Sequence, residues 1–214
     1  PIESFIDEIA RKLKKDPVKF RLSLLEGRAM FTTGDGPGAM KQYPQRIADV
    51  LKLAAEKIGY NEPRKKNHFI GVATHSFIFA KSYAAHAIEI ELLGPKKFRI
   101  VKIVAAIDCG IVINPDGMRN QMEGGVAFAL QQALKGEITI SNSRVVQGGF
   151  HNYELLRYNE MPPVEIYTVL GEQEPGGVGE VGLPTVAPAL CNALAAAGYR
   201  VRKLPLKNEG FEWV

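Results

Sequence analysis

The sequence predicts an α+β fold in which a mostly antiparallel sheet is packed with helices. Apolar residues recur at helical spacing up to residue 58, whereas the apolar period changes to two from Phe69 onward. Helices and strands are therefore segregated along the chain rather than strictly alternating, which is typical of α+β folds. We expect a helical N-terminal segment over residues 1–66 and an α+β region over 67–214, packed as one unit.

Three helices are expected in the N-terminal segment. The first covers residues 2–15 and ends near Asp16-Pro17, because a residue before proline avoids helical backbone. A second follows over 17–26, and a third covers 44–58. The glycine-rich residues 28–42 between them predict a mobile surface loop. The apolar stripe of the first helix consists of Ile2, Phe5, Ile6, Ile9 and Leu13.

Three strand-like runs follow, over residues 68–79, 83–93 and 98–108. Short turn sequences separate them, so they predict an antiparallel meander. Asn114-Pro115-Asp116 then opens a helix that extends to about Leu134, with Asn as the cap.

The last third of the chain mixes short strands with one helix. Strands are expected near 137–146 and 163–170. The glycine-rich stretch from Gly176 to Pro184 leads into a helix of small residues over 185–197.

Composition excludes several classes of protein. Residues 1–66 carry 14 Lys or Arg against 9 Asp or Glu, but without an arginine-rich motif or stacking aromatics, so we expect no nucleic-acid partner. No apolar run approaches the roughly 20 residues of a membrane span. The chain opens at Pro1 inside an apparent helix, so we expect a piece of a longer protein.

The four histidines and two cysteines do not predict a metal site. His68, His75, His86 and His151 form no pair with metal-ligand spacing, and we interpret each as structural. The cysteines form no CxxC pair, and no GxSxG elbow offers a nucleophile.

A GxGxxG match made of Gly177, Gly179 and Gly182 is open to more than one interpretation. A dinucleotide-binding module is one alternative, but only one βαβ unit is possible and no acidic residue follows Gly182 before Glu209. Glu180 would also oppose bound phosphates. A carboxylate held between glycines and apolar neighbours instead suits a general base, while the plain alternative is an exposed glutamate in a turn.

The helix that begins after Asn114 has an unusual polar side. We expect Met118, Met122, Ala129 and Ala133 to face the core and Gln121, Gly125, Phe128 and Gln132 to lie opposite. Gly124 and Gly125 are poor helix formers that mark close approach by a backbone or a ligand. Gln121 could present its amide to a heterocyclic cofactor, or it could be an ordinary exposed glutamine.

Several motifs in order closely resemble one enzyme family. These are Ile107 to Pro115, Gln121 to Gly125, Gly177 to Glu180, and Ala187 to Ala193. They are similar to the molybdenum-cofactor subunit of the xanthine dehydrogenase and aldehyde oxidase family. The opening Glu3 to Glu8 and the stretch Phe150 to Pro162 resemble the bacterial isoquinoline 1-oxidoreductase large (beta) subunit.

The resemblance implies a C-terminal fragment of a molybdenum hydroxylase large subunit, with that family's molybdenum-cofactor-binding fold. Such enzymes hydroxylate an N-heterocyclic aromatic or aldehyde substrate with water as the oxygen source. Glu180 matches the general base that takes a proton from the molybdenum-bound hydroxyl. Gln121 matches a glutamine that hydrogen-bonds the pterin, and Gly179 belongs to the same cofactor-binding motif.

The resemblance also implies cofactors and partners. The cofactor is molybdopterin with molybdenum, in the cytosine dinucleotide form, and the pterin dithiolene holds the metal without protein ligands. Iron–sulfur clusters lie on a small partner subunit. The upstream cofactor loops are absent, so we expect this fragment alone to be inactive. A catalytically silent partner-docking domain remains an alternative, and the compartment, cytoplasmic or periplasmic, is left open.

Overall fold

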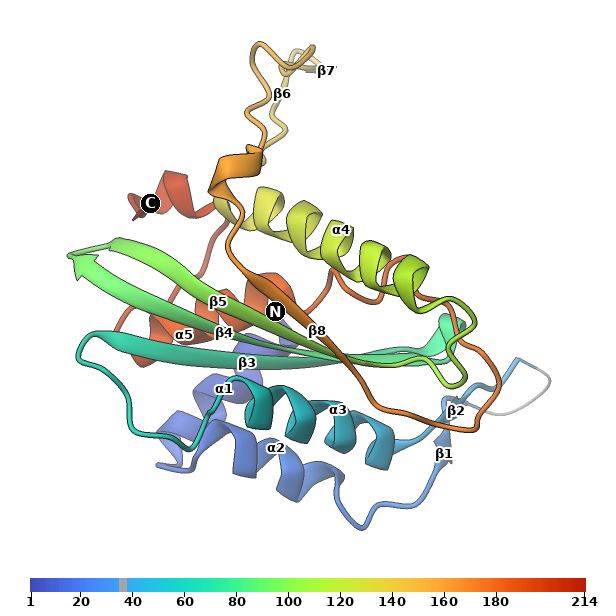
Figure 1. Ribbon diagram of the computed structural model, residues 1–214. Coiled ribbons are helices and arrows are strands. Elements are labelled where there is room, and N and C mark those ends of the chain that lie inside the picture. Colours follow the sequence, from blue (N-terminus) through green and yellow to red (C-terminus); the bar gives the residue numbers. More distant parts are fainter. Residues whose placement is uncertain (35–37) are drawn as a thin grey trace.

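One central sheet with helices on both faces organises the computed structural model, which describes residues 1–34 and 38–214 (Figure 1). Its long strands are β3 (His68–Phe77), β4 (Ser82–Gly94) and β5 (Lys97–Asp108). β3 pairs with β4 and β4 with β5, in both cases antiparallel. Two short strands, β8 (Val164–Thr168) and β9 (Glu212–Trp213), lie parallel to β5. The predicted α+β class and mostly antiparallel sheet are confirmed.

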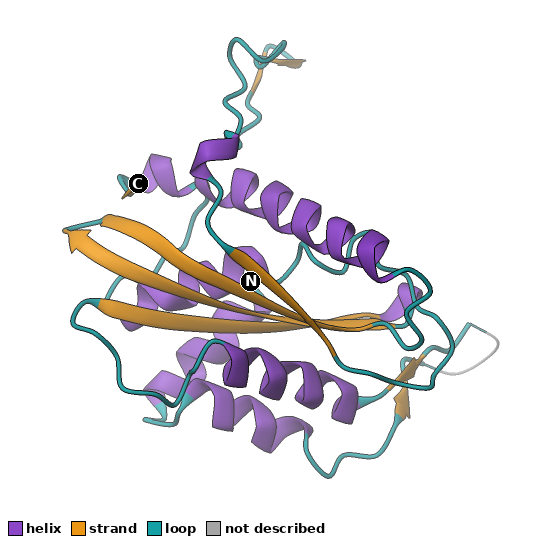
Figure 2. Ribbon diagram, viewed as in Figure 1, coloured by secondary structure: helices purple, strands orange, loops and turns teal. Residues whose placement is uncertain are grey.

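The α-helices lie within a few residues of their predicted positions. They are α1 (Ile2–Lys12), α2 (Pro17–Leu25), α3 (Pro44–Lys57), α4 (Pro115–Leu134) and α5 (Val186–Ala196). α3, backed by α2, covers one face of the sheet, and α4 and α5 cover the other (Figure 2). α1 lies beside the β3 edge, where it contacts both α2 and α5. Short 3-10 helices cover Ile78–Ala80, Tyr158–Glu160 and Leu206–Glu209.

Alternating side chains of the long strands build a separate core on each face of the sheet. Along β4, Ala85 and Ala87 belong to the cluster under α3, whereas Ile88 and Ile90 belong to the cluster under α4 and α5. This is the period-two pattern of a strand that is buried on both sides. The cap of α4 is also as predicted, because the Asn114 side chain accepts a hydrogen bond from the amide of Gly117 at 2.8 Å.

α5 packs directly on the backbone of β3. A β-carbon added to Gly71 would lie 2.1 Å from both the carbonyl oxygen of Ala189 and the amide nitrogen of Ala193. Only glycine permits this approach. α5 is therefore a close neighbour of the sheet edge on which α1 also rests.

The predicted apolar stripe of α1 is not its buried face. Ile2, Phe5 and Leu13 are 75%, 61% and 55% exposed, while Asp7 and Ala10 are buried. Asp7 accepts hydrogen bonds from Arg11 at 2.7 Å and Arg200 at 3.1 Å. Polar contacts therefore fix α1 to the body, and most of its apolar stripe faces outward.

The expected loop over residues 28–42 contains a small hairpin. β1 (Phe31–Thr32) and β2 (Lys41–Gln42) pair antiparallel, so the prediction of a surface loop over 28–42 missed two short strands. Gly36 and Pro37 lie outside the described residues.

A second hairpin projects from the body beyond α4 (Figure 1). It consists of β6 (Ile140–Ser141) and β7 (Arg144–Val145), within the region where short strands were expected. Over residues 1–34 and 38–214, none of the helices is both long enough and apolar enough to cross a membrane.

Candidate functional site

Three chain segments meet at one end of the sheet, which we call the site end. They are the β3–β4 turn, the end of β5, and residues 171–182, which we call the site segment. The amide of Gly176 donates to the carbonyl of Cys109, and the amide of Gly177 donates to the carbonyl of Ala80, both at 2.7 Å. The Ser82 hydroxyl donates to the carbonyl of Gly177 at 2.6 Å. The site segment is thus fixed to two strand ends.

The turn after β5 requires glycine. Gly110 has a φ of +67°, and a β-carbon there would lie 2.4 Å from the carbonyl oxygen of Glu174. The next amide, that of Ile111, donates to the carbonyl of Gln173 at 3.0 Å. The site segment can therefore follow the backbone of this turn closely.

A buried ion pair holds the end of β5 to α3. Arg46 reaches Asp108 with two hydrogen bonds of 2.6 and 2.7 Å, and its guanidinium lies 4.4 Å from the ring of Tyr83. Burial is the largest single influence and lowers the pKa of Arg46, but the hydrogen bonds and charge of Asp108, together with Tyr83, outweigh it and raise that pKa. Asp108 also accepts from the amide of Gly110 at 3.0 Å. This pair links the α3 layer to the turn that holds the site segment.

The three predicted site residues lie together at the site end. The amide nitrogen Nε2 of Gln121 is 3.7 Å from the position of a β-carbon on Gly179. Glu180 follows Gly179 directly, and both Gln121 and Glu180 are exposed. Of the two interpretations of Glu180, the chain shows the exposed one, because Val181 turns into the core while Glu180 faces outward.

The predicted division of α4 into two sides needs one correction. Met118, Met122, Ala129 and Ala133 are buried, as expected. Gly125 is also buried, because Gly182 packs against it at 3.3 Å from where its β-carbon would lie. By contrast, a β-carbon added to Gly124 would have no other atom within 4 Å. The exposed stripe of α4 consists of Gln121, Gly124, Phe128 and Gln132.

Two of the histidines and both cysteines are buried or hydrogen-bonded within the fold. His86 is fully buried, its Nδ1 is hydrogen-bonded to Thr185 Oγ1, and burial lowers its pKa to about 3. His68 pairs with Glu89 at 2.9 Å. Cys109 and Cys191 are buried free thiols, and burial raises the pKa of Cys191 to about 11. Within residues 1–34 and 38–214, no group of three or more His, Cys, Asp or Glu is placed to hold a metal ion.

Sequence reasoning missed the Arg46–Asp108 pair. Asp108 stands in a stretch that the motif comparison singled out, but Arg46 lies 62 residues earlier on a different layer. No local pattern marks such a partner, because the pair forms only when α3 packs on the sheet. An arginine in the first turn of α3 is unfavourable next to the helix dipole, and this was the one available signal.

Comparison with known proteins gives consistent matches. The family of molybdopterin cofactor-binding domains matches residues 38–162 of the chain. Isoquinoline 1-oxidoreductase subunit beta of Brevundimonas diminuta is 30% identical over 210 residues, which cover 96% of this chain and 25% of the relative. The membrane-bound aldehyde dehydrogenase (pyrroloquinoline-quinone) of Gluconacetobacter polyoxogenes is 30% identical over 215 residues, which cover 96% and 27%.

The fold has a solved counterpart. The structure of aldehyde oxidoreductase from Desulfovibrio gigas superposes with a TM-score of 0.68, over 95% of this chain and 39% of that chain, at 12% identity. At this identity the likeness concerns the fold alone. The chain spans about a quarter of the length of the two curated relatives.

Proposed function

The chain belongs to the family of molybdopterin cofactor-binding domains, and from this premise we propose that it forms one wall of the cofactor site in a molybdenum hydroxylase large subunit. The single observation that carries this proposal is the nearness of Gln121 to Gly179, where a β-carbon would lie 3.7 Å from the amide nitrogen of Gln121. α4 and the site segment are far apart in the sequence, yet they bring a helix-borne amide beside the backbone that bears Glu180. The resemblance selects the same three residues.

The residues at the site end fit a flat heterocycle. The Gln121 amide is exposed and offers both a donor and an acceptor, which matches the mixed edge of a pterin. Gly179 and Gly124 have no side chains, so a planar ring can approach the backbone near Gln121. When bound, molybdopterin holds molybdenum through its own dithiolene and supplies the redox chemistry, so no cluster of protein ligands is required.

Glu180 is the proton acceptor in this proposal. Its carboxylate stands on the outer side of the site segment, one residue from the backbone beside Gln121. A general base must lie within hydrogen-bond reach of the proton that it removes. In the whole subunit, Glu180 accepts the proton that leaves as a water-derived oxygen is transferred to an N-heterocycle or an aldehyde. The remaining subunit must supply the burial that Glu180 lacks here.

Partners follow from the same proposal. One relative is named as subunit beta of its enzyme. We therefore place this chain in a multi-subunit enzyme, with the rest of the molybdenum-binding subunit beside it and a small iron–sulfur subunit as electron acceptor. The cytosine dinucleotide form of the pterin is part of this proposal.

Two other cofactors are less well supported. One relative carries pyrroloquinoline quinone in its name, but the matching family is one of molybdopterin cofactor-binding domains. A dinucleotide site needs a tight turn between a strand and a helix. Here β8 ends at Thr168 and α5 begins at Val186, so the glycines of the site segment do not form such a turn.

The test of Glu180 uses the longer subunit with its partner. Glu180→Gln should lower the turnover of an aldehyde or N-heterocycle about 10²–10⁴-fold because the general base is lost, while the molybdenum content stays unchanged. Glu172→Gln, another exposed glutamate of the site segment, is the matched control and should leave turnover intact. Unchanged turnover in Glu180→Gln would remove this residue from the mechanism.

A second test asks whether the 214-residue chain alone binds the cofactor. Metal and pterin analysis of the 214-residue chain alone should find neither, because it supplies only one wall. A stoichiometric amount of molybdenum in this chain would contradict the division of the site between this chain and the rest of the subunit.

A further inference from the structure

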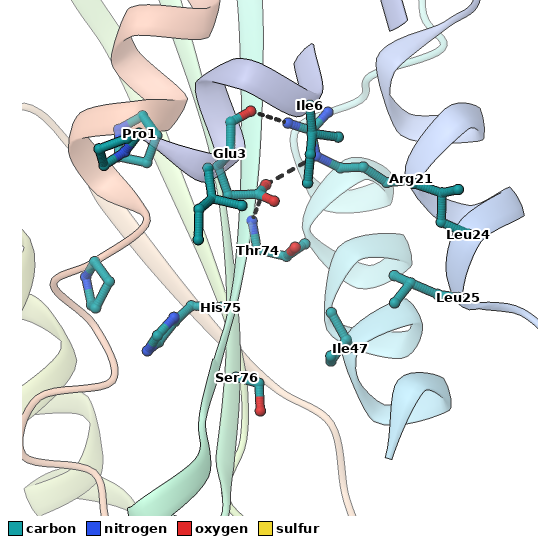
Figure 3. A pocket seen from close by; sticks show the side chains of 13 residues that line it. Pro1, Glu3, Ile6, Arg21, Leu24, Leu25, Ile47, Thr74, His75 and Ser76 are labelled. Atoms are coloured by element: carbon teal, nitrogen blue, oxygen red, sulfur yellow. Dashed lines mark hydrogen bonds and ion pairs between the residues drawn. The ribbon is translucent and has the colours of Figure 1, made fainter. Parts of the chain in front are cut away.

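A cavity of about 350 Å³ lies at the outer edge of β3 (Figure 3), and Gln121 is not among the residues that line it. Its walls come from α1, α2 and α3 on one side and from the start of α5 on the other. Figure 3 shows Leu25 and Ile47 facing Thr74 and Ser76 across the cavity, with His75 pointing to the opposite side of β3. The floor is therefore a strand edge.

The backbone of this edge faces the cavity. The amide of Thr74 donates to the Glu3 carboxylate at 2.8 Å, and the carbonyl of Val72 accepts from the Asn192 side chain at 2.9 Å. Both groups thus point away from β4. Because backbone direction alternates along an antiparallel strand, Ser76 directs its amide and carbonyl the same way. At Thr74 the side chain of Glu3 occupies the place of a neighbouring strand. At Ser76 the backbone amide and carbonyl face the cavity.

The side chains that line the cavity carry no unpaired charge. Arg21 is 2% exposed and donates to the Glu3 carboxylate at 2.9 Å, to the Glu3 carbonyl at 2.7 Å and to the Pro17 carbonyl at 3.1 Å. His75 is half-buried, and burial lowers its pKa, so it is neutral at pH 7. The other walls are apolar, made by Ile6, Leu24, Leu25 and Ile47 opposite Pro184 and Pro188. The side chains of the cavity therefore offer no charged partner to a ligand.

The exposed apolar stripe of α1 continues the cavity. Ile2 and Ile6 belong to both, and Phe5 lies beside them on the same side of the helix. A stripe with this spacing normally packs against another part of the protein. Together the stripe and the cavity form one apolar surface that borders an open strand edge.

We propose that the edge of β3 at Ser76 accepts an extended, uncharged segment of the longer subunit as an additional strand. Such a strand would bond to the Ser76 backbone and place alternate side chains against Leu25 and Ile47 on one side and Pro184 and Pro188 on the other. The relatives are about four times as long as this chain, so most of a subunit is available to supply the segment. This inference rests on the proposed function, which makes the chain part of that subunit.

The added strand would also border the candidate site. Phe77 packs against the cluster that contains Met122 and Val181, and the rings of His75 and Phe77 are 6.0 Å apart. A strand along Ser76 would therefore support the β3–β4 turn from outside. This gives the segment a structural reason to lie beside the cofactor wall.

Hydrogen exchange at Ser76 tests the proposal. The Ser76 amide should exchange at least about tenfold more slowly in the longer subunit than in the 214-residue chain, because a strand bond protects it only there. Equal exchange in both proteins would overturn the proposal. Light scattering of the 214-residue chain checks for a second copy, and a dimer that protects Ser76 would also overturn it.

Two variants separate the backbone from the side chain. Ser76→Pro removes the outward amide, which an edge strand tolerates, and Ser76→Ala removes only the hydroxyl. Both should leave the 214-residue chain folded. In the longer subunit, Ser76→Pro should speed exchange over Ile2 to Ile6 at least about tenfold relative to Ser76→Ala, because the docked segment is released. Equal exchange in the two variants would contradict strand addition.

Molybdenum content of the same preparations keeps the two proposals apart. A longer subunit that holds molybdenum but leaves Ser76 unprotected contradicts only the added strand. A subunit with Ser76 protected and no molybdenum contradicts the proposed function and leaves the strand in place.

Discussion

α1 and α3 have the same kind of apolar stripe and use it in opposite ways. In α3 the stripe packs on the sheet, and Val50, Leu51 and Ala54 are fully buried. In α1 the buried face instead carries Asp7, and much of the stripe faces outward. A helical period thus indicates that an apolar surface exists, but what covers this surface depends on chain that lies elsewhere. In our proposal, the exposed stripe of α1 is the surface that meets the rest of the subunit.

A leucine-to-alanine substitution should change the free energy of unfolding far more in α3 than in α1. Leu51→Ala removes a fully buried side chain and should lower the free energy of unfolding by about 2–5 kcal/mol, because a cavity forms under α3. Urea denaturation of the 214-residue chain measures this. A loss below about 1 kcal/mol would mean that α3 is not the core helix of this layer.

Loss of the ion pair between Arg46 and Asp108 should have the next largest effect on the free energy of unfolding. Arg46→Ala leaves the buried carboxylate of Asp108 without its cation, and we expect a loss of about 3 kcal/mol. The amides of Gly110 and Gly176 should then exchange faster than those of α4, because Asp108 holds the turn beside the site segment. If amide exchange rose equally in the turn and in α4, the ion pair would stabilise the whole fold and not this turn in particular.

The polar anchor of α1 should contribute somewhat less. Asp7→Ala removes the acceptor shared by Arg11 and Arg200, and the expected loss is about 1–3 kcal/mol. Glu8→Ala is the control, because its partner Arg202 is exposed and no measurable change is expected. If the two variants unfolded at the same urea concentration, polar contacts would not be what holds α1.

Acid should loosen the α5 side of the sheet, on which α1 rests, before the α3 side. His86 contacts Thr185 at the start of α5, and its pKa of about 3 lies below the 6.5 of an exposed imidazole. The unfolded chain therefore binds the proton first, and stability falls as the pH drops from 6.5 toward 3, by up to about 1.4 kcal/mol per unit. His75 is shifted in the same direction and adds to this.

A matched pair of variants checks the acid effect. His86→Gln should flatten the fall in stability between pH 7 and pH 5, whereas substitution of the exposed His151 should not. Hydrogen exchange at pH 5 should open α5 and α1 ahead of α3. The same pH dependence in wild type and His86→Gln would assign the acid effect to other groups.

Substitution in the exposed stripe of α1 should have the smallest effect on stability. Leu13→Ala makes the same chemical change as Leu51→Ala, but Leu13 is 55% exposed, so the change in stability of the 214-residue chain should stay within about 0.5 kcal/mol. A loss comparable to that of Leu51→Ala would show that the stripe is packed in solution and would remove the contrast between the two helices.

Periodicity predicted most of the elements, because burial imposes a period of 3.6 on a helix and of two on a strand. Turn and cap residues such as Asn114 fixed several boundaries. The hairpin of β1 and β2 was missed, since two-residue strands carry no periodic signal. The outward direction of the α1 stripe was missed because Arg200, the partner of Asp7, lies 193 residues away.

The candidate site was predicted in part. Motif resemblance selected Gln121, Gly179 and Glu180, and the structure brings them to one place. Their catalytic and cofactor roles stay predictions. The sequence left the exposure of Glu180 open, because exposure depends on the neighbours that a side chain has in space and not on the residues adjacent to it in the sequence.

Pterin content is the most direct measurement of the central claim. Gln121→Leu in the longer subunit removes the amide that the cofactor would contact, and Gln132→Leu changes another exposed glutamine on the same helix. We predict that Gln121→Leu lowers the molybdopterin bound per subunit at least about tenfold at limiting cofactor, since a hydrogen bond to a buried polar edge is lost, while Gln132→Leu leaves it unchanged. Equal molybdopterin content in both variants would contradict the placement of the cofactor against this wall.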